Sequence, residues 1–334
     1  MTRKGIVLAG TVVLDIVNVI EQWPDEEQIA FIRETIPAPG GPPHNAAAGL
    51  VKLQASFAIT LIGVVGDDAH GDIFIEKAAG YGLDTSRLRR AKGLATDYTH
   101  VMTSIDTGRR TFFFGPGVNN TLLADDLLPP DDTAKIFYLG SPGLSTSMDK
   151  SDGWRDVLKN VRERGFKTCM ELCPVPAETQ RTQVRPCLPL LDYFVINDSE
   201  AEIVSGVLVV ENGAFVPARA EQACRKLLAM GVNDTTAIHH PQGAVAVKHT
   251  GETIYAPSVN VPKSDIAGSV GAGDAFYAGM LLGLHEDWPL SECMALANAS
   301  AATSLQSATT SASIRPWKAC LDYAAKRGLN IAAP

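Results

Sequence analysis

The sequence lacks any run of about 20 apolar residues, the length that a helix needs to cross a bilayer. An apolar stretch does run from Ile6 to Leu14, but Asp15 interrupts it and no small-residue cleavage site follows. We therefore interpret this stretch as a first strand and expect no membrane partner. The six cysteines show no CxxC spacing, which argues against a zinc site or a disulfide scaffold and favours reduced thiols in the cytoplasm.

Positive charge is also scarce. Lys and Arg total 29 against 37 Asp and Glu, a net charge of -8, so a nucleic-acid partner is not expected. Local pairs such as Arg109 and Arg110 are interpreted as solvated surface. At 334 residues the chain exceeds the length at which one core usually stops growing, yet no Pro-, Gly- or Ser-rich linker divides it.

Four common catalytic motifs are absent: a GxxxxGK[ST] loop, a GxGxxG after a strand, an HRD and DFG pair, and an HExxH helix. These absences exclude P-loop kinases, simple dinucleotide-binding enzymes, protein kinases and common zinc proteases.

Strand and helix patterns alternate along most of the chain, which indicates a layered α/β fold with helices on both faces of a sheet. Asn45 is predicted to cap one helix and Gly71 to open another. Apolar β-branched runs predict strands at 6–9, 12–17, 58–65, 135–139, 167–171, 193–196, 236–238 and 244–248. Further helices are predicted at 153–164, 219–230, 275–284 and 290–304.

Residues 97–114 break this rhythm. Two strand-like runs flank Asp106, Thr107 and Gly108, a strong hairpin signal. Neither this hairpin nor the polar stretch at 18–37 has helices of its own to cover it. Together they are predicted to form a small sheet that projects from the main body as a lid.

The sharpest motif is GSVGAGDAFYAGMLLGL at 268–284, where a helix is predicted to begin near Asp274. Unpaired amides at a helix amino terminus carry partial positive charge, so Gly271, Ala272 and Gly273 are suited to hold an anion. An aspartate beside an anion fits a general base that deprotonates an attacking group. Alternatively, Asp274 only caps the helix.

A second glycine motif, GGPPHNAAAGL, occupies 40–50. Either Gly40, Gly41 and Asn45 form a turn and a helix cap, or they present backbone and an amide to a polyhydroxylated substrate. Asp15 ends an apolar run, and a buried unpaired carboxylate is costly. It therefore faces water or accepts hydrogen bonds from the hydroxyls of a sugar.

A third cluster, INDSEAEIVSG at 196–206, places Asn197 and Glu200 three residues apart at a helix start. A capping box explains this spacing without any ligand. The same residue types also suit the water shell of a metal and a phosphate.

Taken together, GGPPHN, GDDAHG at 66–71, GLDTS at 82–86, NDSEAE and VGAGDAF resemble the PfkB, or ribokinase-like, carbohydrate kinase family. The resemblance covers nearly the whole chain in the right order. It implies one ribokinase-like domain over 1–334, a three-layer α/β/α sandwich with a small β-sheet lid whose strands are inserted at about 15–38 and 96–120. It also implies transfer of the γ-phosphoryl group of ATP to a hydroxymethyl of a small sugar.

Residue roles follow from the resemblance position by position. Asp274 is the implied general base, and Gly271, Ala272 and Gly273 form the implied anion hole. Substrate hydroxyls would be held by Asp15, Gly40, Gly41 and Asn45. The nucleotide and Mg²⁺ region would include Asn197, Glu200, Gly243 and Asn298, with Glu200 acting on the metal indirectly.

Two departures from the family pattern stand out. Gly268 occupies the position of an aspartate that often precedes GAGD, which argues against a potassium-type monovalent cation site. Before the adenine pocket, relatives carry a Thr-x-Gly turn where this chain has Ile238, His239 and His240. We interpret the two histidines as loop residues and not as metal ligands.

The sequence does not decide which molecule accepts the phosphoryl group. Phe112, Phe113 and Phe114 in the lid could stack on a nucleobase, which favours an adenosine-type nucleoside kinase as the alternative, or could simply pack the lid. A binding module that has lost turnover is a further alternative. The apolar hairpin is also compatible with a homodimer that pairs through the lid.

Overall fold

In the computed structural model, which describes residues 3–106, 109–268, 271–307 and 312–330, a nine-stranded sheet forms the centre of the molecule. Its strand order is β15-β14-β13-β10-β9-β8-β1-β4-β5, and β14 alone runs opposite to the other strands, because it pairs antiparallel with both β13 and β15. The strands are β1 (Ile6–Gly10), β4 (Ile59–Gly66), β5 (Leu88–Ala91), β8 (Ile136–Gly140), β9 (Lys167–Glu171), β10 (Tyr193–Asn197), β13 (Thr235–His240), β14 (Gly243–Lys248) and β15 (Thr253–Pro257).

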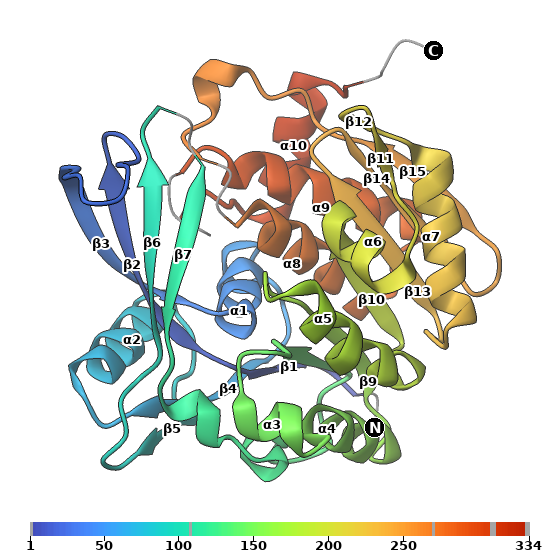
Figure 1. Cartoon of the computed structure of the whole chain (residues 1–334). Helices are drawn as coiled ribbons and strands as arrows, with labels where there is room; N and C mark the ends of the chain where they lie inside the picture. Colours follow the sequence, from blue (N-terminus) through green and yellow to red (C-terminus); the bar gives the residue numbers. More distant parts are fainter. Residues whose placement is uncertain (1–2, 107–108, 269–270, 308–311, 331–334) are drawn as a thin grey trace.

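Helices cover both faces of this sheet because alternate side chains of its apolar strands point to opposite sides. In β1, Ile6 and Leu8 pack into one core, whereas Val7 and Ala9 pack into another. The first core is closed by α1 (Pro42–Lys52), α2 (Ala69–Gly80), α8 (Ala272–His285), α9 (Leu290–Ser304) and α10 (Trp317–Arg327). The second is closed by α3 (Thr146–Lys150), α4 (Gly153–Glu163), α5 (Ala177–Val184), α6 (Asp198–Ser205) and α7 (Pro217–Ala229). The predicted three-layer α/β/α fold is confirmed (Figure 1).

A separate four-stranded sheet stands beside the main one, at the left of Figure 1. Its order is β3-β2-β6-β7, formed by β2 (Val13–Ile20), β3 (Ile32–Gly40), β6 (Tyr98–Ser104) and β7 (Arg110–Gly115). Strands β6 and β7 pair antiparallel, as predicted for the hairpin, while its turn residues Thr107 and Gly108 lie outside the described residues. A small ribbon of β11 (Val210–Glu211) and β12 (Ala214–Phe215) completes the strands, and 3-10 turns lie at Val118–Thr121, Ala124–Leu127, Arg185–Leu190 and Lys263–Asp265.

Two predicted helix starts were wrong. Helix α1 begins at Pro42, and Gly41 is its N-cap residue, so Asn45 lies inside the helix instead of capping it. Proline at the first helical position lacks only an N–H that would be unpaired there, which explains the earlier start. Helix α2 begins at Ala69, since the Asp68 side chain accepts a hydrogen bond from the Gly71 amide.

His239 and His240 end strand β13, so their interpretation as loop residues was also wrong.

Within the part of the chain that the structure describes, no helix is both long and apolar enough to cross a membrane.

Candidate active site

The amino terminus of α8 is the centre of the candidate site. Gly271 is its N-cap residue and has a φ of 74°, a left-handed conformation that glycine adopts without strain. The first helical residues, Ala272 and Gly273, therefore offer unpaired amides at the positive end of the helix dipole. A Cβ on Gly273 would lie 3.3 Å from Cε1 of His239, so the His239 ring packs close to this glycine.

Packing fixes the helix in this place. The Tyr277 hydroxyl donates to the carbonyl oxygen of Met170 at 3.1 Å, which ties α8 to the end of β9. On the opposite side, Gly279 is so close to α9 that a Cβ there would lie 2.7 Å from the Cα of Ala297. The apolar and small residues from which this helix was predicted are therefore the residues that it buries against its neighbours.

Asp274 lies in the first turn of α8, so the prediction of a helix start near it is accurate to two residues, and Gly271 is the cap instead. Its Oδ2 accepts a hydrogen bond from Asn45 Nδ2 at 3.2 Å. Its carboxyl group also contacts that of Glu171 and lies near the positive charge of Arg110. Burial raises the pKa of Asp274 above its usual range, against the opposing effects of these three neighbours.

Asp15 shares this space, in the body of β2 and not at a strand end. A Cβ on Gly40 would lie 2.2 Å from its Oδ2, so only glycine lets the neighbouring strand pass the carboxyl group. Burial raises the pKa of Asp15 to about 7, although the Arg110 charge and a hydrogen bond from Thr99 lower it in part. The structure thus brings Asp15, Gly40, Asn45 and Asp274 together.

The strand pairing of the small sheet shows which side chains lie on the same face as Asp15. Asp15 pairs with Thr99, which pairs with Phe114, so these three side chains share one face. By the same alternation Phe112 and Arg110 lie on that face. Arg110 is half-buried, and its charge acts on both Asp15 and Asp274, so its interpretation as solvated surface was wrong. Phe113 points to the other face and stacks on Trp23.

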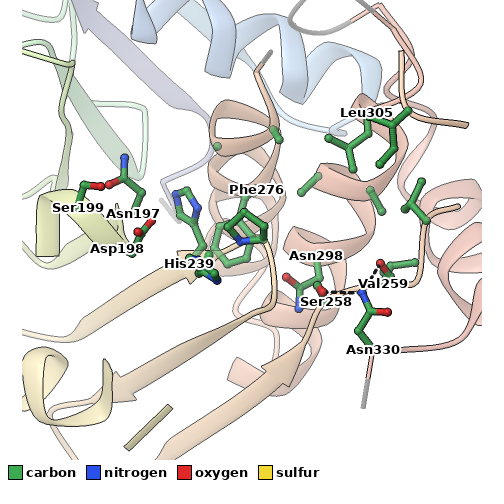
Figure 2. Close-up of a pocket in the computed structure, with 18 residues that line it drawn as sticks. Asn197, Asp198, Ser199, His239, Ser258, Val259, Phe276, Asn298, Leu305 and Asn330 are labelled. Carbon is green, nitrogen blue, oxygen red and sulfur yellow. Dashed lines mark hydrogen bonds between the residues drawn. The ribbon is translucent and has the colours of Figure 1, made fainter. Parts of the chain in front are cut away.

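On the other side of the α8 amino terminus lies a cavity of about 530 Å³ (Figure 2). Ala272 and Gly273 line it, whereas the next residue, Asp274, contacts Asn45. The remaining lining residues are Asn197, Asp198, Ser199, His239, His240, Pro241, Ser258, Val259, Val261, Ile266, Phe276, Asn298, Ala301, Ala302, Leu305 and Asn330.

Of the four predicted nucleotide residues, two line this cavity and two do not. Asn197 lines the cavity and forms a reciprocal capping box with Glu200, whose Oε2 accepts from the Asn197 amide at 3.0 Å. Burial raises the pKa of Glu200 to about 7, and Glu200 itself does not line the cavity. Gly243, the first residue of β14, also lies outside the lining, whereas Asn298 on α9 belongs to it.

Sequence reasoning missed much of the cavity wall. Burial lowers the pKa of His239 to about 4, and its ring lies 4.9 Å from that of Phe276. These two rings and Gly273 line the same part of the cavity wall. Figure 2 shows Ser258, Val259 and Leu305 on the opposite wall. Small and apolar residues in late loops and on α9 give no signal that separates a pocket from a core.

Within the described residues, no group of three or more His, Cys, Asp or Glu side chains is arranged to hold a metal ion. The described side chains alone therefore do not form a coordination site for Mg²⁺. Such an ion is commonly bound through substrate phosphates and water with one or two protein carboxylates. The site fits Mg²⁺ only in that way.

Comparison with known proteins finds a matching family and several relatives of this chain. The family model described as pfkB family carbohydrate kinase matches residues 8–318. A 5-dehydro-2-deoxygluconokinase from Geobacillus kaustophilus is 24% identical over 295 residues, covering 85% of this chain and 82% of its own. An Arabidopsis thaliana ribokinase complexed with ribose and ATP superposes with a TM-score of 0.76 at 22% identity, over 97% of this chain and 99% of that one. A Burkholderia thailandensis nucleoside kinase in complex with inosine reaches a TM-score of 0.73 at 16% identity, over 97% and 98% of the two chains.

The family match and these relatives therefore identify a phosphotransferase with an alcohol group as acceptor. The chain belongs to the PfkB family of carbohydrate kinases, as its motifs had indicated.

Proposed function

We propose that this protein transfers the γ-phosphoryl group of ATP to a hydroxymethyl of a small sugar. One observation supports this most: Gly273 faces the 530 Å³ cavity, while Asp274, the next residue, contacts Asn45 and lies near Asp15. A nucleotide in the cavity and a sugar beside Asp15 would meet at the helix amino terminus. The ATP bound by the Arabidopsis ribokinase is compatible with this arrangement.

In this mechanism the amides of Gly271, Ala272 and Gly273 hold the transferring phosphoryl group, whose negative charge spreads as the bond to the leaving group lengthens. Asp274 accepts the proton of the acceptor hydroxyl as that oxygen bonds to phosphorus. Mg²⁺ bound to the nucleotide phosphates would neutralise part of their charge. Asn197 and Glu200 would orient its water shell.

The acceptor is held from the other side. The Asp15 carboxylate accepts hydrogen bonds from sugar hydroxyls, and Gly40, Gly41 and Asn45 complete this wall. The small sheet of β2, β3, β6 and β7 acts as a lid. Its closure would exclude water, which otherwise attacks ATP without transfer to the sugar.

A nucleoside acceptor is the second candidate because of one specific arrangement. Phe112 and Phe114 lie on the same sheet face as Asp15, at alternate positions of β7. Phe112 is 47% exposed, so its ring is available to stack on a base. The Burkholderia nucleoside kinase bound to inosine shares the fold.

An ADP-release assay over ribose, fructose, other sugars and several nucleosides tests both candidates. Transfer to a sugar with little to any nucleoside supports the proposal, and the reverse preference supports the second candidate. If nucleotide binds but no acceptor stimulates ADP release, the protein is a binding module without turnover.

Two further proposals concern assembly and location. Large apolar side chains are exposed on and beside the lid strands: Trp23, Ile29, Phe31 and Ile32. We propose that a second copy covers them in a homodimer. A single monomeric mass in light scattering would contradict this. We also propose a cytoplasmic location, since all six cysteines are free and buried; cell fractionation tests it.

A further inference from the structure

Glu171 ends strand β9 and places a second carboxyl group against that of Asp274. Both sides of this contact are fixed by packing. The hydroxyl of the fully buried Tyr138 donates to Glu171 Oε2, and the hydroxyl of Tyr277 donates to the carbonyl of Met170, the residue before Glu171. Tyr277 lies one turn after Asp274 on α8, so the two carboxyl groups are held opposite each other.

Two half-buried carboxyl groups in contact do not both ionise readily, because like charges at this distance repel strongly where little water screens them. One proton between them turns the repulsion into a hydrogen bond. The neighbours decide which group keeps it. Asp274 accepts from the Asn45 amide and lies near the Arg110 charge, and both favour its ionised form.

Glu171 has weaker support for its ionised form, a single hydrogen bond from Tyr138 that lowers its pKa. No Lys or Arg among the residues with described structure forms an ion pair with it. Burial, followed by the Asp274 charge, raises the pKa of Glu171 well above its usual range. Its Oε2 accepts from Tyr138, which leaves the other oxygen to carry a hydrogen toward Asp274.

We propose that Glu171 is a positioning residue that stays a neutral carboxylic acid and donates a hydrogen bond to the Asp274 carboxylate. This bond and the one from Asn45 together fix the rotation of the Asp274 side chain, so that its remaining acceptor direction points to the acceptor hydroxyl. The inference rests on the proposed function of Asp274 as the general base.

The proton balance of the reaction is unchanged. The acceptor O–H bond breaks and its oxygen forms a bond to the γ-phosphorus, while the bond from that phosphorus to the bridging oxygen breaks and ADP leaves with the electron pair. The proton passes to Asp274, and Glu171 keeps its own proton. Ionisable groups also face the pair from the surrounding elements: Tyr138 on β8, Glu200 on α6, Tyr277 on α8, Asp15 on β2, Arg110 on β7, and Cys169 and Cys173 in and after β9.

Two substitutions of Glu171 separate a neutral donor from a charged group. In Glu171→Gln the amide still donates to Asp274 and accepts from Tyr138 at every pH, so kcat stays within about threefold of the unsubstituted enzyme. In Glu171→Leu the shape is similar but the donor is gone, and kcat falls about 10–100-fold from loss of orientation, with KM for ATP unchanged. The pH profile of Glu171→Gln keeps its acid limb, while the alkaline limb moves to higher pH.

Opposite results overturn the proposal. Equal losses in both variants would mean that a negative charge at this position is required, and a raised Mg²⁺ requirement in Glu171→Gln would identify a metal-bound carboxylate. Full activity in Glu171→Leu would leave Glu171 without a role.

A measurement without turnover keeps the inference separate from the proposed function and does not depend on the folding of the leucine variant. Infrared spectroscopy of ¹³C-glutamate-labelled protein at neutral pH should show the C=O stretch of a protonated carboxylic acid that Glu171→Gln lacks. Tyr138→Phe removes only the hydroxyl, so this band should move to higher frequency as its hydrogen bond is lost. If the band is present but no acceptor is phosphorylated, the proposed function fails and the carboxyl pair stands. If the band is absent, the carboxyl pair fails.

Discussion

Asn45 Nδ2 donates to Asp274 Oδ2 at 3.2 Å, and this contact joins residues 229 positions apart in the sequence. It brings the early glycine motif on α1 to the late glycine motif on α8. In the proposed mechanism the Asp274 carboxylate accepts the hydroxyl proton. The Asn45 side-chain amide orients this carboxylate, and its hydrogen bond favours the ionised form.

Substitution of Asn45 tests this relationship. Asn45→Ala removes one hydrogen bond to a charged group, worth about 1.5–3 kcal/mol, so kcat/KM should fall about 10–100-fold. Asn45→Asp should be at least as slow, because a second carboxylate beside Asp274 raises the pKa of the base. Steady-state kinetics checks both, and an Asn45→Asp enzyme as fast as the unsubstituted one would contradict the account.

The pKa of Asp15 predicts how acceptor binding depends on pH. Its pKa is raised to about 7, so the carboxylate, which accepts the sugar hydroxyls, forms as pH rises through about 7. KM for the acceptor should therefore fall between pH 6 and 8, while KM for ATP does not follow it. In Asp15→Asn this pH dependence should disappear; its persistence would assign it to another group.

His44 predicts a loss of stability in acid. Its ring is 1% exposed, packs edge-on against Phe74 and Tyr81, and has Nδ1 3.2 Å from Asn45 Oδ1. Burial lowers the pKa of His44 to about 4, below the unfolded value of 6.5. The unfolded chain therefore binds the proton first, and stability present above about pH 6.5 is lost as pH falls toward 4, by up to about 3 kcal/mol.

Urea unfolding at pH 7 and pH 5 measures this loss. His44→Phe fills the same aromatic site without a titrating group, so its free energy of unfolding should change less between the two pH values. His239, whose pKa is also lowered to about 4, remains in both proteins and contributes equally. An identical pH dependence in both would assign the loss elsewhere.

Because α8 packs closely against α9, replacing a glycine there by alanine should destabilise the protein, whereas the same substitution at an open helix position should stabilise it. At Gly279 a Cβ would lie 2.7 Å from the Ala297 Cα, so Gly279→Ala should lower the free energy of unfolding by about 1–3 kcal/mol. At Gly80, the last residue of α2, a Cβ would have no neighbour within 4 Å. Gly80→Ala should therefore raise it by about 0.5–1 kcal/mol, as helix propensity predicts. Similar losses at both sites in thermal or urea unfolding would contradict this.

Much of the fold could be predicted because it depends on local pattern. Continuous apolar runs in β1 and β8 require burial on both faces, and the hairpin of β6 and β7 follows from its turn residues. Short exposed strands were harder: β5 reads LRRA, with Arg89 and Arg90 outward, and no run of apolar residues marks it.

The candidate site likewise contains residues that local motifs could predict and residues whose role depends on how distant segments pack. Glycine motifs with a neighbouring Asp or Asn could be recognised, because close backbone approach and a helix amino terminus need those residue types. Glu171 ends its strand like any polar residue, and its contact with Asp274 depends on how α8 docks on β9. Arg110 likewise looks solvated until the register of β7 turns it toward Asp15.

The most direct test of the account is Asp274→Asn. The amide keeps the size of the side chain but does not accept the hydroxyl proton as a base. Single-turnover transfer should be slower by roughly 10²–10⁴, the usual contribution of a positioned general base, while ATP affinity measured by calorimetry stays unchanged. Near-normal transfer in this variant would contradict the assignment of Asp274 as the base.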